Sequence, residues 1–284
     1  MNRVLVTGAE GFIGRALCRA LKSNGCQVRE LTRRQGDISD APVLDNVEDV
    51  EHVFHLAART FVPDSWKDPL GFHRTNVLGT VNVLDYCRQH NARMTFMCAY
   101  LYGTPSTLPV SENCTPHPNN PYAMSKYLAE QTCQFYAEHY GVKVVVVRPF
   151  NIYGPGQKSD FLVPGILDQI RRGTTIRVKD LKPRRDFIYI DDLVAALVRT
   201  MHQSGGFDAI NIGSGQSISV RDVISIAQAA AGTALPVREE GEVRVNEIPD
   251  VYADISKAWT TLQWKPTINF AQGIDQMLQQ EVAP

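Results

Sequence analysis

A glycine-rich turn near the start of the chain constrains its fold most strongly. The sequence VTGAEGFIG places Gly8, Gly11 and Gly14 three residues apart, directly after an apolar run and at the start of an amphipathic segment. Glycines permit a tight turn and let backbone N–H groups approach a phosphate, and the positive end of the following helix attracts an anion. Three glycines alone are a weak signal, but this strand and helix context favours a dinucleotide site over a merely structural turn.

Apolar runs and helical patterns alternate through the first half of the chain. The runs are RVLVTG, QVREL, HVFHLAA, ARMTFMCA and VKVVVVRPF. Between them lie longer helical patterns, which include residues 12–24, a segment that ends near His90, and residues 122–140. This alternation predicts an α/β fold with a Rossmann-like, doubly wound parallel sheet that is covered on both faces.

The pattern changes after about Phe150. NIYGPGQ is rich in turn residues, and several short elements follow it, ending in a predicted helix over residues 270–280. We therefore predict a dinucleotide-binding Rossmann domain over residues 1–150. Residues 151–284 are expected to form mainly a smaller substrate-binding lobe, with some segments that return to the sheet. Ligands of open sheets bind beyond the carboxyl ends of the strands, so cofactor and substrate are expected between the two parts.

Composition narrows the classes of function. The chain has 284 residues, of which 44% are hydrophobic and 21% charged, and its net charge is -1. This balance supplies no overall field toward nucleic acid or an anionic membrane, so neither is expected as a partner. The six cysteines are scattered without a C-x-x-C pair, which is typical of reduced thiols in a cytoplasmic protein. The histidines show no metal-ligand spacing, so no metal is predicted.

The tip of the second apolar run indicates which dinucleotide is bound. An acidic residue there holds the ribose 2′-hydroxyl of NAD, whereas a basic residue accepts the 2′-phosphate of NADP. Thr32, Arg33 and Arg34 follow this run without a carboxylate, and arginine pairs bidentately with phosphate. NADP is therefore favoured and NAD is the alternative, because two solvated arginines would give the same pattern. Asp37 and Ile38 are candidates for holding the adenine amino group and ring face.

The segment NNPYAMSK predicts the start of a helix and carries a candidate catalytic pair. Asn120 is a good N-cap, and Pro121 suits the first helical position. Tyr122 and Lys126 are four residues apart and therefore share one helix face. A phenol beside a fixed ammonium has a lowered pKa and can act as an acid or base toward a carbinol. The alternative is an exposed tyrosine and lysine that are neighbours without a chemical role.

Together with the glycine turn, this pair resembles the short-chain dehydrogenase/reductase superfamily. Further segments resemble its extended branch, the NAD(P)-dependent nucleotide-sugar epimerases, dehydratases and reductases. The matching segments span nearly the whole chain: VTGAEGFIG, HLAA, NVLGT, LYG, YAMSK, RPFNIYGPGQ, RRDFIYIDD and YADISKA. The resemblance implies hydride transfer at a sugar carbon, most often carbon 4, of a nucleoside-diphosphate hexose. It also implies a homodimer.

The resemblance further implies roles for single residues. Tyr122 would exchange the proton of the sugar hydroxyl or ketone, and Lys126 would hold the nicotinamide ribose. The other residues expected to contact the dinucleotide are Gly8, Gly11, Phe12, Ile13, Gly14, Leu56, Ala57, Ala58, Asn76 and Phe150. The residues expected to contact the sugar nucleotide are Tyr100, Asn151, Arg185 and Arg244.

Cys98 departs from the family pattern. The third catalytic residue of the family is a serine or threonine four positions before the tyrosine of the YG turn, and counting back from Tyr102 gives Cys98. A thiol is a weak hydrogen-bond donor, which puts efficient catalysis in doubt. The related 4,6-dehydratases have Asp-Glu at the next two positions, whereas Ala99 and Tyr100 follow here, which argues against dehydration. The catalytic cysteine of the 3,5-epimerases lies two positions later than Cys98.

Two reactions and one non-catalytic role remain open. A net 4-ketoreductase consumes NADPH, which agrees with the arginines at the strand tip, and DLKPRRDF resembles a loop of GDP-4-keto-6-deoxymannose reductases. A 4-epimerase similar to UDP-glucose 4-epimerase would oxidise and re-reduce its substrate with a retained NAD. The reductase is slightly favoured. A dinucleotide-binding sensor is the third alternative, which Cys98 favours and the intact Tyr122 and Lys126 disfavour.

Overall fold

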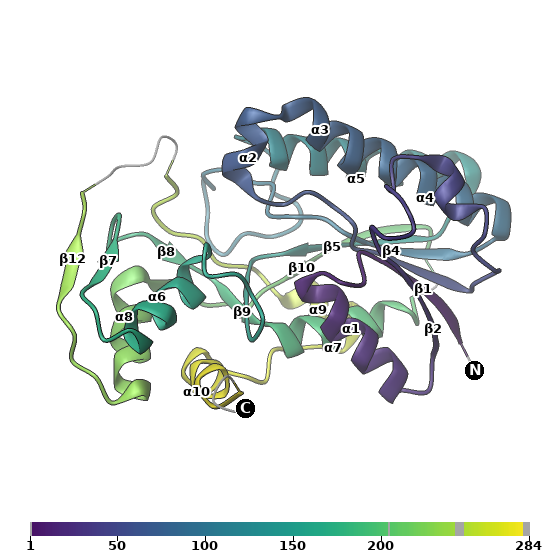
Figure 1. Ribbon diagram of the computed structural model, residues 1–284. Helices are drawn as coiled ribbons and strands as arrows, with labels where there is room; N and C mark the ends of the chain where they lie inside the picture. Colours follow the sequence, from purple (N-terminus) through teal and green to yellow (C-terminus); the bar gives the residue numbers. More distant parts are fainter. Residues whose placement is uncertain (1, 204, 242–246, 281–284) are drawn as a thin grey trace.

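A parallel six-stranded sheet forms the centre of the molecule, with the strand order β10–β5–β4–β3–β1–β2 (Figure 1). The computed structural model describes residues 2–203, 205–241 and 247–280. The strands are β1 (Arg3–Thr7), β2 (Gln27–Leu31), β3 (His52–His55), β4 (Arg93–Met97), β5 (Val144–Pro149) and β10 (Phe207–Ile212). The first five match the predicted apolar runs, and the predicted α/β fold with a parallel sheet is confirmed.

β5 and β10 illustrate how the sheet is built. All six residues of β5, VVVVRP, are buried, as expected for a parallel strand covered on both faces. β10 comes from the second half of the chain and pairs with β5 from Phe207 opposite Val144 to Ile212 opposite Pro149. The sixth strand is therefore supplied by a segment that returns from beyond residue 150.

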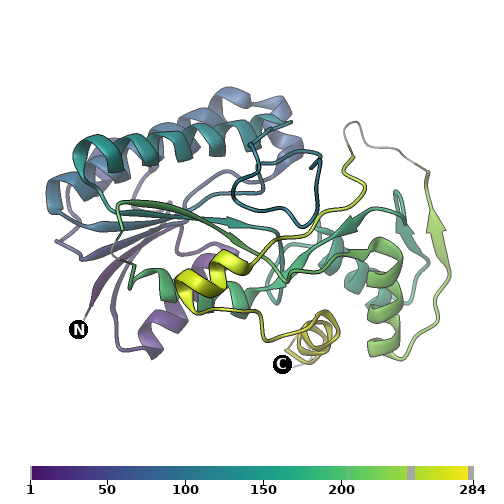
Figure 2. The ribbon, with the colours of Figure 1, turned by 180° about the vertical axis from the view of Figure 1, so that it is seen from behind.

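Helices cover both faces of the sheet (Figures 1 and 2). α4 (Gly79–His90) and α5 (Pro121–Tyr140) lie on one face, and α1 (Phe12–Ser23), α7 (Ile190–Thr200) and α9 (Ser256–Leu262) lie on the other. The short helical turn η1 (Ala41–Leu44) lies between β2 and β3. Three further short helical segments lie between β3 and α4: α2 (Val62–Lys67), α3 (Pro69–His73) and the π-helical η2 (Arg74–Leu78). α5 begins as predicted, because the side chain of Asn120 accepts a hydrogen bond from Ala123 N at 2.9 Å.

The remaining elements form a smaller lobe beyond the carboxyl ends of the strands (Figure 1). Its helices are α6 (Leu162–Arg171), α8 (Val220–Ala231) and α10 (Phe270–Gln280). Its strands form three pairs: β6 (Asn151–Tyr153) with β9 (Phe187–Tyr189), β7 (Ile176–Val178) with β12 (Val237–Glu239), and β8 (Arg184–Arg185) with β11 (Ile218–Ser219).

Two buried carboxylates of the RRDFIYIDD segment hold this lobe together. Asp186 accepts hydrogen bonds from the backbone N–H groups of Ser214, Gly215 and Ala253. Asp192 accepts from the backbone of residues 267 and 268, the stretch that leads into α10. Buried charges are tolerated when hydrogen bonds of this kind satisfy them. These carboxylates have a structural role.

Candidate active site

A cavity of about 1480 Å³ lies between the sheet and the smaller lobe. Its wall includes residues that directly follow the sheet strands, such as Gly8, Ala57 and Phe150, and residues of the lobe, such as Phe161 and Phe187. Single small-molecule sites are usually about 300–1,000 Å³. The cavity is therefore large enough for a dinucleotide together with a second ligand.

The glycine turn is shaped to bring backbone N–H groups to this cavity. Gly8 has a φ of +70°, and a Cβ atom there would lie 2.8 Å from Ala57 N. A Cβ atom on Gly14 would overlap the Gly8 carbonyl oxygen. Only glycine fits at both positions, so the turn can pack against β3 while the first turn of α1 faces the cavity. This cradle fits the pyrophosphate of a dinucleotide.

Most of the residues predicted to contact the cofactor line the cavity. They are Gly8, Gly11, Phe12, Ile13, Gly14, Thr32, Arg33, Asp37, Ile38, Leu56, Ala57, Ala58, Tyr122, Lys126 and Phe150. The Oδ1 atom of Asp37 accepts hydrogen bonds from the backbone N–H and the hydroxyl of Ser39, and these lower the pKa of Asp37. The cavity wall therefore includes both the Arg33 guanidinium and the Asp37 carboxylate beyond the end of β2.

Two predicted cofactor residues, Arg34 and Asn76, do not line the cavity. The exposed side chain of Arg34 forms an ion pair with the lining residue Glu10, with 3.2 Å between Nε and Oε1. Asn76 is fully buried behind the wall. Its Oδ1 accepts from Arg59 N at 2.8 Å, and its Nδ2 donates to the Arg59 carbonyl and to Ser125 Oγ. The sequence indicated which residue types stand at these two positions, but not the neighbouring residues that bind their polar groups.

The candidate catalytic pair lies together on α5 at the cavity. Tyr122 and Lys126 both line it, and Lys126 Nζ is 4.1 Å from the centre of the Phe96 ring, a cation–π contact. Burial lowers the pKa of Lys126 to about 8, so the ammonium is the main form at neutral pH. Lys126 is thus a charged group in a largely apolar wall.

The pKa of Tyr122 differs from the prediction. A neighbouring ammonium was expected to lower it, but burial, with Cys98 as a smaller cause, raises the pKa of the phenol. Burial disfavours the charged form of any group, and it is the largest cause of this shift. The phenol is therefore held in its protonated form.

The Cys98 thiol lines the cavity but is directed toward α5. Its Sγ donates to the Lys126 carbonyl at 3.7 Å, and the side chain is only 2% exposed. Burial raises the pKa of Cys98 well above its usual value. Cys98 is thus a neutral thiol, and a thiolate nucleophile is not favoured here.

Of the four residues predicted to contact the substrate, two line the cavity. Tyr100 and Asn151 line the cavity, where the Tyr100 hydroxyl donates to the Gly103 carbonyl at 2.7 Å and Asn151 Nδ2 donates to the Asp186 carbonyl at 3.0 Å. Arg185 does not line it, and its guanidinium pairs with Glu247 and donates to the Arg184 carbonyl. Arg244 lies outside the described residues.

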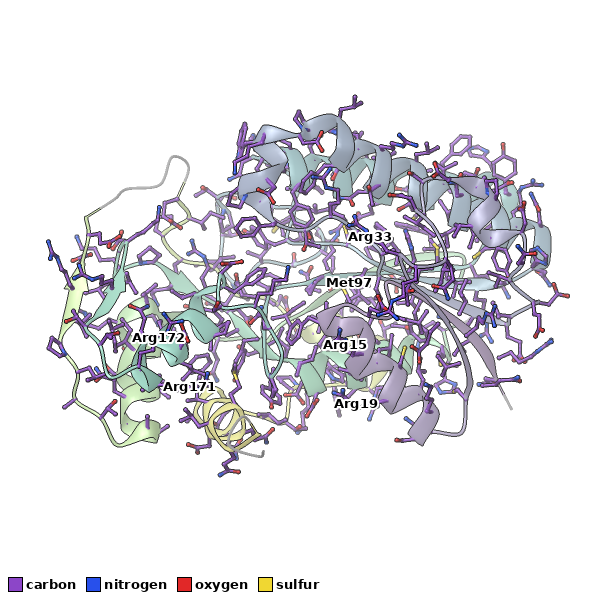
Figure 3. The ribbon with its side chains drawn as sticks, in the orientation of Figure 1. Arg15, Arg19, Arg33, Met97, Arg171 and Arg172 are labelled. Atoms are coloured by element: carbon purple, nitrogen blue, oxygen red, sulfur yellow. The ribbon has the colours of Figure 1, made fainter. Side chains whose placement is uncertain are left out.

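Arg15, Arg19 and Lys158 are cations at the cavity that were missed from the sequence, whereas Arg33 was predicted. Arg15 and Arg19 extend from α1, and Arg33 lies beyond the end of β2; all three line the cavity (Figure 3). Lys158, in the loop after β6, also lines it. The four-residue spacing of Arg15 and Arg19 puts both on one face of α1, so the sequence carried a signal for this pair. Their charges add to the attraction for a phosphorylated ligand.

Over residues 2–203, 205–241 and 247–280, no three His, Cys, Asp or Glu side chains are grouped so that they could hold a metal ion. Nor does any helix in these ranges have the length and apolar character needed to cross a membrane.

Comparison with known proteins assigns the family. Residues 4–213 match the sequence model of the NAD dependent epimerase/dehydratase family. The chain belongs to this family. The resemblance deduced from the motifs is thereby confirmed, and the NAD dependent epimerase/dehydratase assignment agrees with the glycine cradle. The chain is an enzyme that uses a nicotinamide dinucleotide.

Relatives within the family include both reductases and epimerases. GDP-6-deoxy-D-mannose reductase of Pseudomonas aeruginosa is 31% identical, and the alignment covers 98% of this chain and 96% of the reductase. The solved structure of RMD from Pseudomonas aeruginosa with NADPH is 29% identical, with a TM-score of 0.90 and 98% of each chain covered. UDP-glucose 4-epimerase of Thermotoga maritima with UDP-glucose is 26% identical, with a TM-score of 0.91 and coverage of 98% and 97%.

Proposed function

We propose that this enzyme is an NADPH-dependent 4-ketoreductase that acts on a nucleoside-diphosphate hexose. The observation that carries the proposal lies at the tip of β2, where Arg33 lines the cavity. Thr32 stands at this tip, where a site for NAD would have an acidic residue. An arginine there suits the 2′-phosphate of NADP, the dinucleotide of reductive reactions. The 31% identical GDP-6-deoxy-D-mannose reductase supports the same class of reaction.

The two residues on α5 would divide the proton chemistry and the positioning. Tyr122, whose pKa is raised by burial, would donate its proton to the sugar carbonyl oxygen as the hydroxyl forms. A protonated phenol is the form a reduction needs, whereas oxidation of an alcohol requires a base at this position. Lys126 would hold the nicotinamide ribose through its ammonium. A bound NADPH supplies the hydride.

The two arginines at the tip of β2 can be separated by experiment. Replacing Arg33 by Ala should weaken NADP binding by about tenfold or more while leaving NAD nearly unaffected, because a charge-assisted pair with phosphate is lost. Arg34→Ala is the matched control: Arg34 is paired with Glu10 and does not line the cavity, so its loss should matter less. Titration of both dinucleotides by fluorescence gives the comparison, and equal losses for the two variants would contradict this assignment.

A 4-epimerase is the second candidate function. The structural likeness to UDP-glucose 4-epimerase of Thermotoga maritima, with a TM-score of 0.91, favours it. The Asp37 carboxylate in the cavity wall is also compatible with a ribose 2′-hydroxyl. Tyr122 would then have to act first as a base and afterwards as an acid, with the dinucleotide retained between the two steps.

The remaining assignments follow from the same proposal. The lobe formed mainly by residues 151–284 would bind the sugar nucleotide, with contacts from its Asn151 and from Tyr100 of the Rossmann domain. Exposed apolar side chains on α5, including Leu128 at 40% and Phe135 at 50% exposed, support a homodimer formed through this helix. The six cysteines are free, which supports a reducing cytoplasm.

Incubation with NADPH and a panel of 4-keto and 4-hydroxy nucleotide sugars tests the proposal. Net oxidation of NADPH with a 4-keto substrate is expected. Conversion of one 4-hydroxy isomer into another without net oxidation would establish the epimerase instead. Binding of NADPH without turnover of any member of the panel would favour the sensor.

A further inference from the structure

A buried histidine at the carboxyl end of β3 links two threonines from different elements. His55 Nδ1 is 2.8 Å from Thr7 Oγ1 at the end of β1, and His55 Nε2 is 3.1 Å from Thr80 Oγ1 in α4. His55 is 1% exposed, and both threonines are fully buried. All four atoms are therefore cut off from water, and each must be satisfied within the protein.

The hydrogen bonds continue from Thr80 to the catalytic helix. Thr80 Oγ1 donates to the Asn76 carbonyl at 2.7 Å, and Asn76 Nδ2 donates to Ser125 Oγ at 2.9 Å. Ser125 Oγ in turn donates to the Tyr122 carbonyl at 2.7 Å. We refer to these five residues as the His55 relay: Thr7, His55, Thr80, Asn76 and Ser125. Asn76 takes part through its backbone carbonyl toward Thr80 and through its side chain toward Ser125.

The relay fixes where the His55 proton lies. The only hydrogen of the Thr80 hydroxyl is used for the Asn76 carbonyl, so Thr80 Oγ1 can only accept from His55, and Nε2 must carry the proton. Nδ1 then accepts from the Thr7 hydroxyl, while Thr7 Oγ1 accepts from Ala57 N at 3.1 Å. Only a neutral imidazole satisfies every partner. Burial lowers the pKa of His55 to about 3, which agrees with a neutral ring.

A neutral His55 ring also avoids charge repulsion with Lys126, which contacts the neighbouring Phe96 ring. The rings of His55 and Phe96 are stacked with 5.8 Å between their centres, and the Lys126 ammonium lies 4.1 Å from the centre of the same Phe96 ring. A protonated His55 would repel Lys126 through a medium of low dielectric. A neutral His55 removes this repulsion from the Lys126 ammonium.

The two ends of the relay lie at the two halves of the cofactor site. At one end, Thr7 and Ala57 line the cavity, and Ala57 packs directly against Gly8 of the glycine turn. At the other end, Ser125 lies on α5 between Tyr122 and Lys126. The relay therefore spans from the wall beside the glycine turn to the helix that carries the catalytic pair.

We propose that His55 is a positioning residue for the cofactor: through the His55 relay it holds the turns after β1 and β3 in register with α5. A dinucleotide that lies in the glycine cradle then meets Tyr122 and Lys126 in the correct place. This inference rests on the dinucleotide site of the proposed function but not on the sugar or on the direction of the reaction.

The other histidine of β3 provides an internal control. His52 lies at the opposite end of the strand, is 2% exposed, and its Nε2 is 2.8 Å from Oγ1 of the fully buried Thr95. Burial lowers its pKa to about 3, as for His55. Neither His52 nor Thr95 lines the cavity. Of the two buried histidines of β3, only His55 is bonded to a residue that lines the cavity, Thr7.

Thr80→Val and Thr95→Val make the matched test, because each replaces a fully buried threonine by an isosteric side chain without the hydroxyl. Both should lower the melting temperature by similar amounts. Only Thr80→Val should raise the Kd for NADPH, by about five- to tenfold, the effect of one to two hydrogen bonds. Thr80→Ser, which keeps the hydroxyl, should restore the affinity. NADPH binding is measured by fluorescence without any sugar, so failure of the ketoreductase reaction does not affect the result.

Ser125→Ala is the second variant, because it cuts the far end of the relay with a residue that favours helix. It should weaken NADPH in the same direction and also lower the melting temperature, because the buried Asn76 Nδ2 loses one acceptor. The inference is overturned if Thr80→Val and Ser125→Ala bind NADPH as tightly as Thr95→Val does. It is also overturned if Thr80→Ser weakens NADPH as much as Thr80→Val, since the hydroxyl would then have no part in the effect.

Discussion

At the scale of single residues, the proton-donor role proposed for Tyr122 can be tested most directly. Replacing Tyr122 by Phe removes the proton donor but keeps the ring and its edge contact with Phe72. Loss of a positioned acid typically costs about 10²- to 10⁴-fold in rate, so kcat should fall by this amount. The Kd for NADPH should stay nearly constant, because the proposed role of the phenol is toward the sugar carbonyl. Steady-state rates and a binding titration check this, and undiminished turnover would remove Tyr122 from the mechanism.

Cys98 gives the second prediction at this scale. Cys98→Ser should preserve or raise kcat, because a hydroxyl is a stronger donor than the neutral thiol found here. Cys133→Ser is the control: Cys133 is also buried on this side of the sheet but does not line the cavity, so it reports the cost of burying a hydroxyl. A large loss of kcat with Cys98→Ser alone would mean that the thiol has a function of its own.

At the scale of elements, the junction of β1 and α1 depends on a close backbone approach. Gly14→Ala should weaken NADPH binding by more than about tenfold, because the new Cβ would overlap the Gly8 carbonyl and push α1 out of the cradle. Gly25→Ala, at the other end of α1, is the matched control. Gly25 has a φ of +75° and no atom within 4 Å of an added Cβ, so its substitution strains the backbone far from the cavity. Wild-type affinity in the Gly14 variant would contradict the cradle.

The elements also show what the sequence could and could not reveal. Alternating apolar runs indicated β1 to β5, because parallel strands buried on both faces need such runs. The glycine turn and the spacing of Tyr122 and Lys126 placed the main parts of the site for the same local reasons. The pairing of Arg34 with Glu10 and the burial of Asn76 were missed, because both depend on residues brought together from different elements. The burial that raises the pKa of Tyr122 is likewise a property of the packed structure.

At the scale of the whole molecule, two buried histidines connect folding to pH. Burial lowers the pKa of both His52 and His55 from 6.5 to about 3. The unfolded chain binds these protons below pH 6.5 and the folded chain does not, so stability is complete above that pH and falls as the pH decreases. Between about pH 7.5 and about pH 5 each histidine should remove about 2 kcal/mol from the free energy of unfolding.

Urea unfolding at the two pH values measures this loss. His52→Gln should reduce the pH-dependent loss in the free energy of unfolding by the share of one histidine, because a glutamine does not titrate. Stability that is equal at both pH values would mean that the buried rings are protonated in the folded chain. Carboxylates with lowered pKa values, such as those of Asp37 and Asp222, lose their contribution only at still lower pH, so they do not account for the change in this window.

Following the transferred hydride is the most direct test of the reaction proposed for the whole enzyme. NADPH carrying deuterium at the transferred position, incubated with a 4-keto nucleotide sugar, should yield a product with one deuterium at carbon 4 and one NADP formed per product. Mass spectrometry locates the label, and absorbance counts the NADPH consumed. A product isomer that forms without net NADPH oxidation, or a deuterium found at another carbon, would contradict the ketoreductase account.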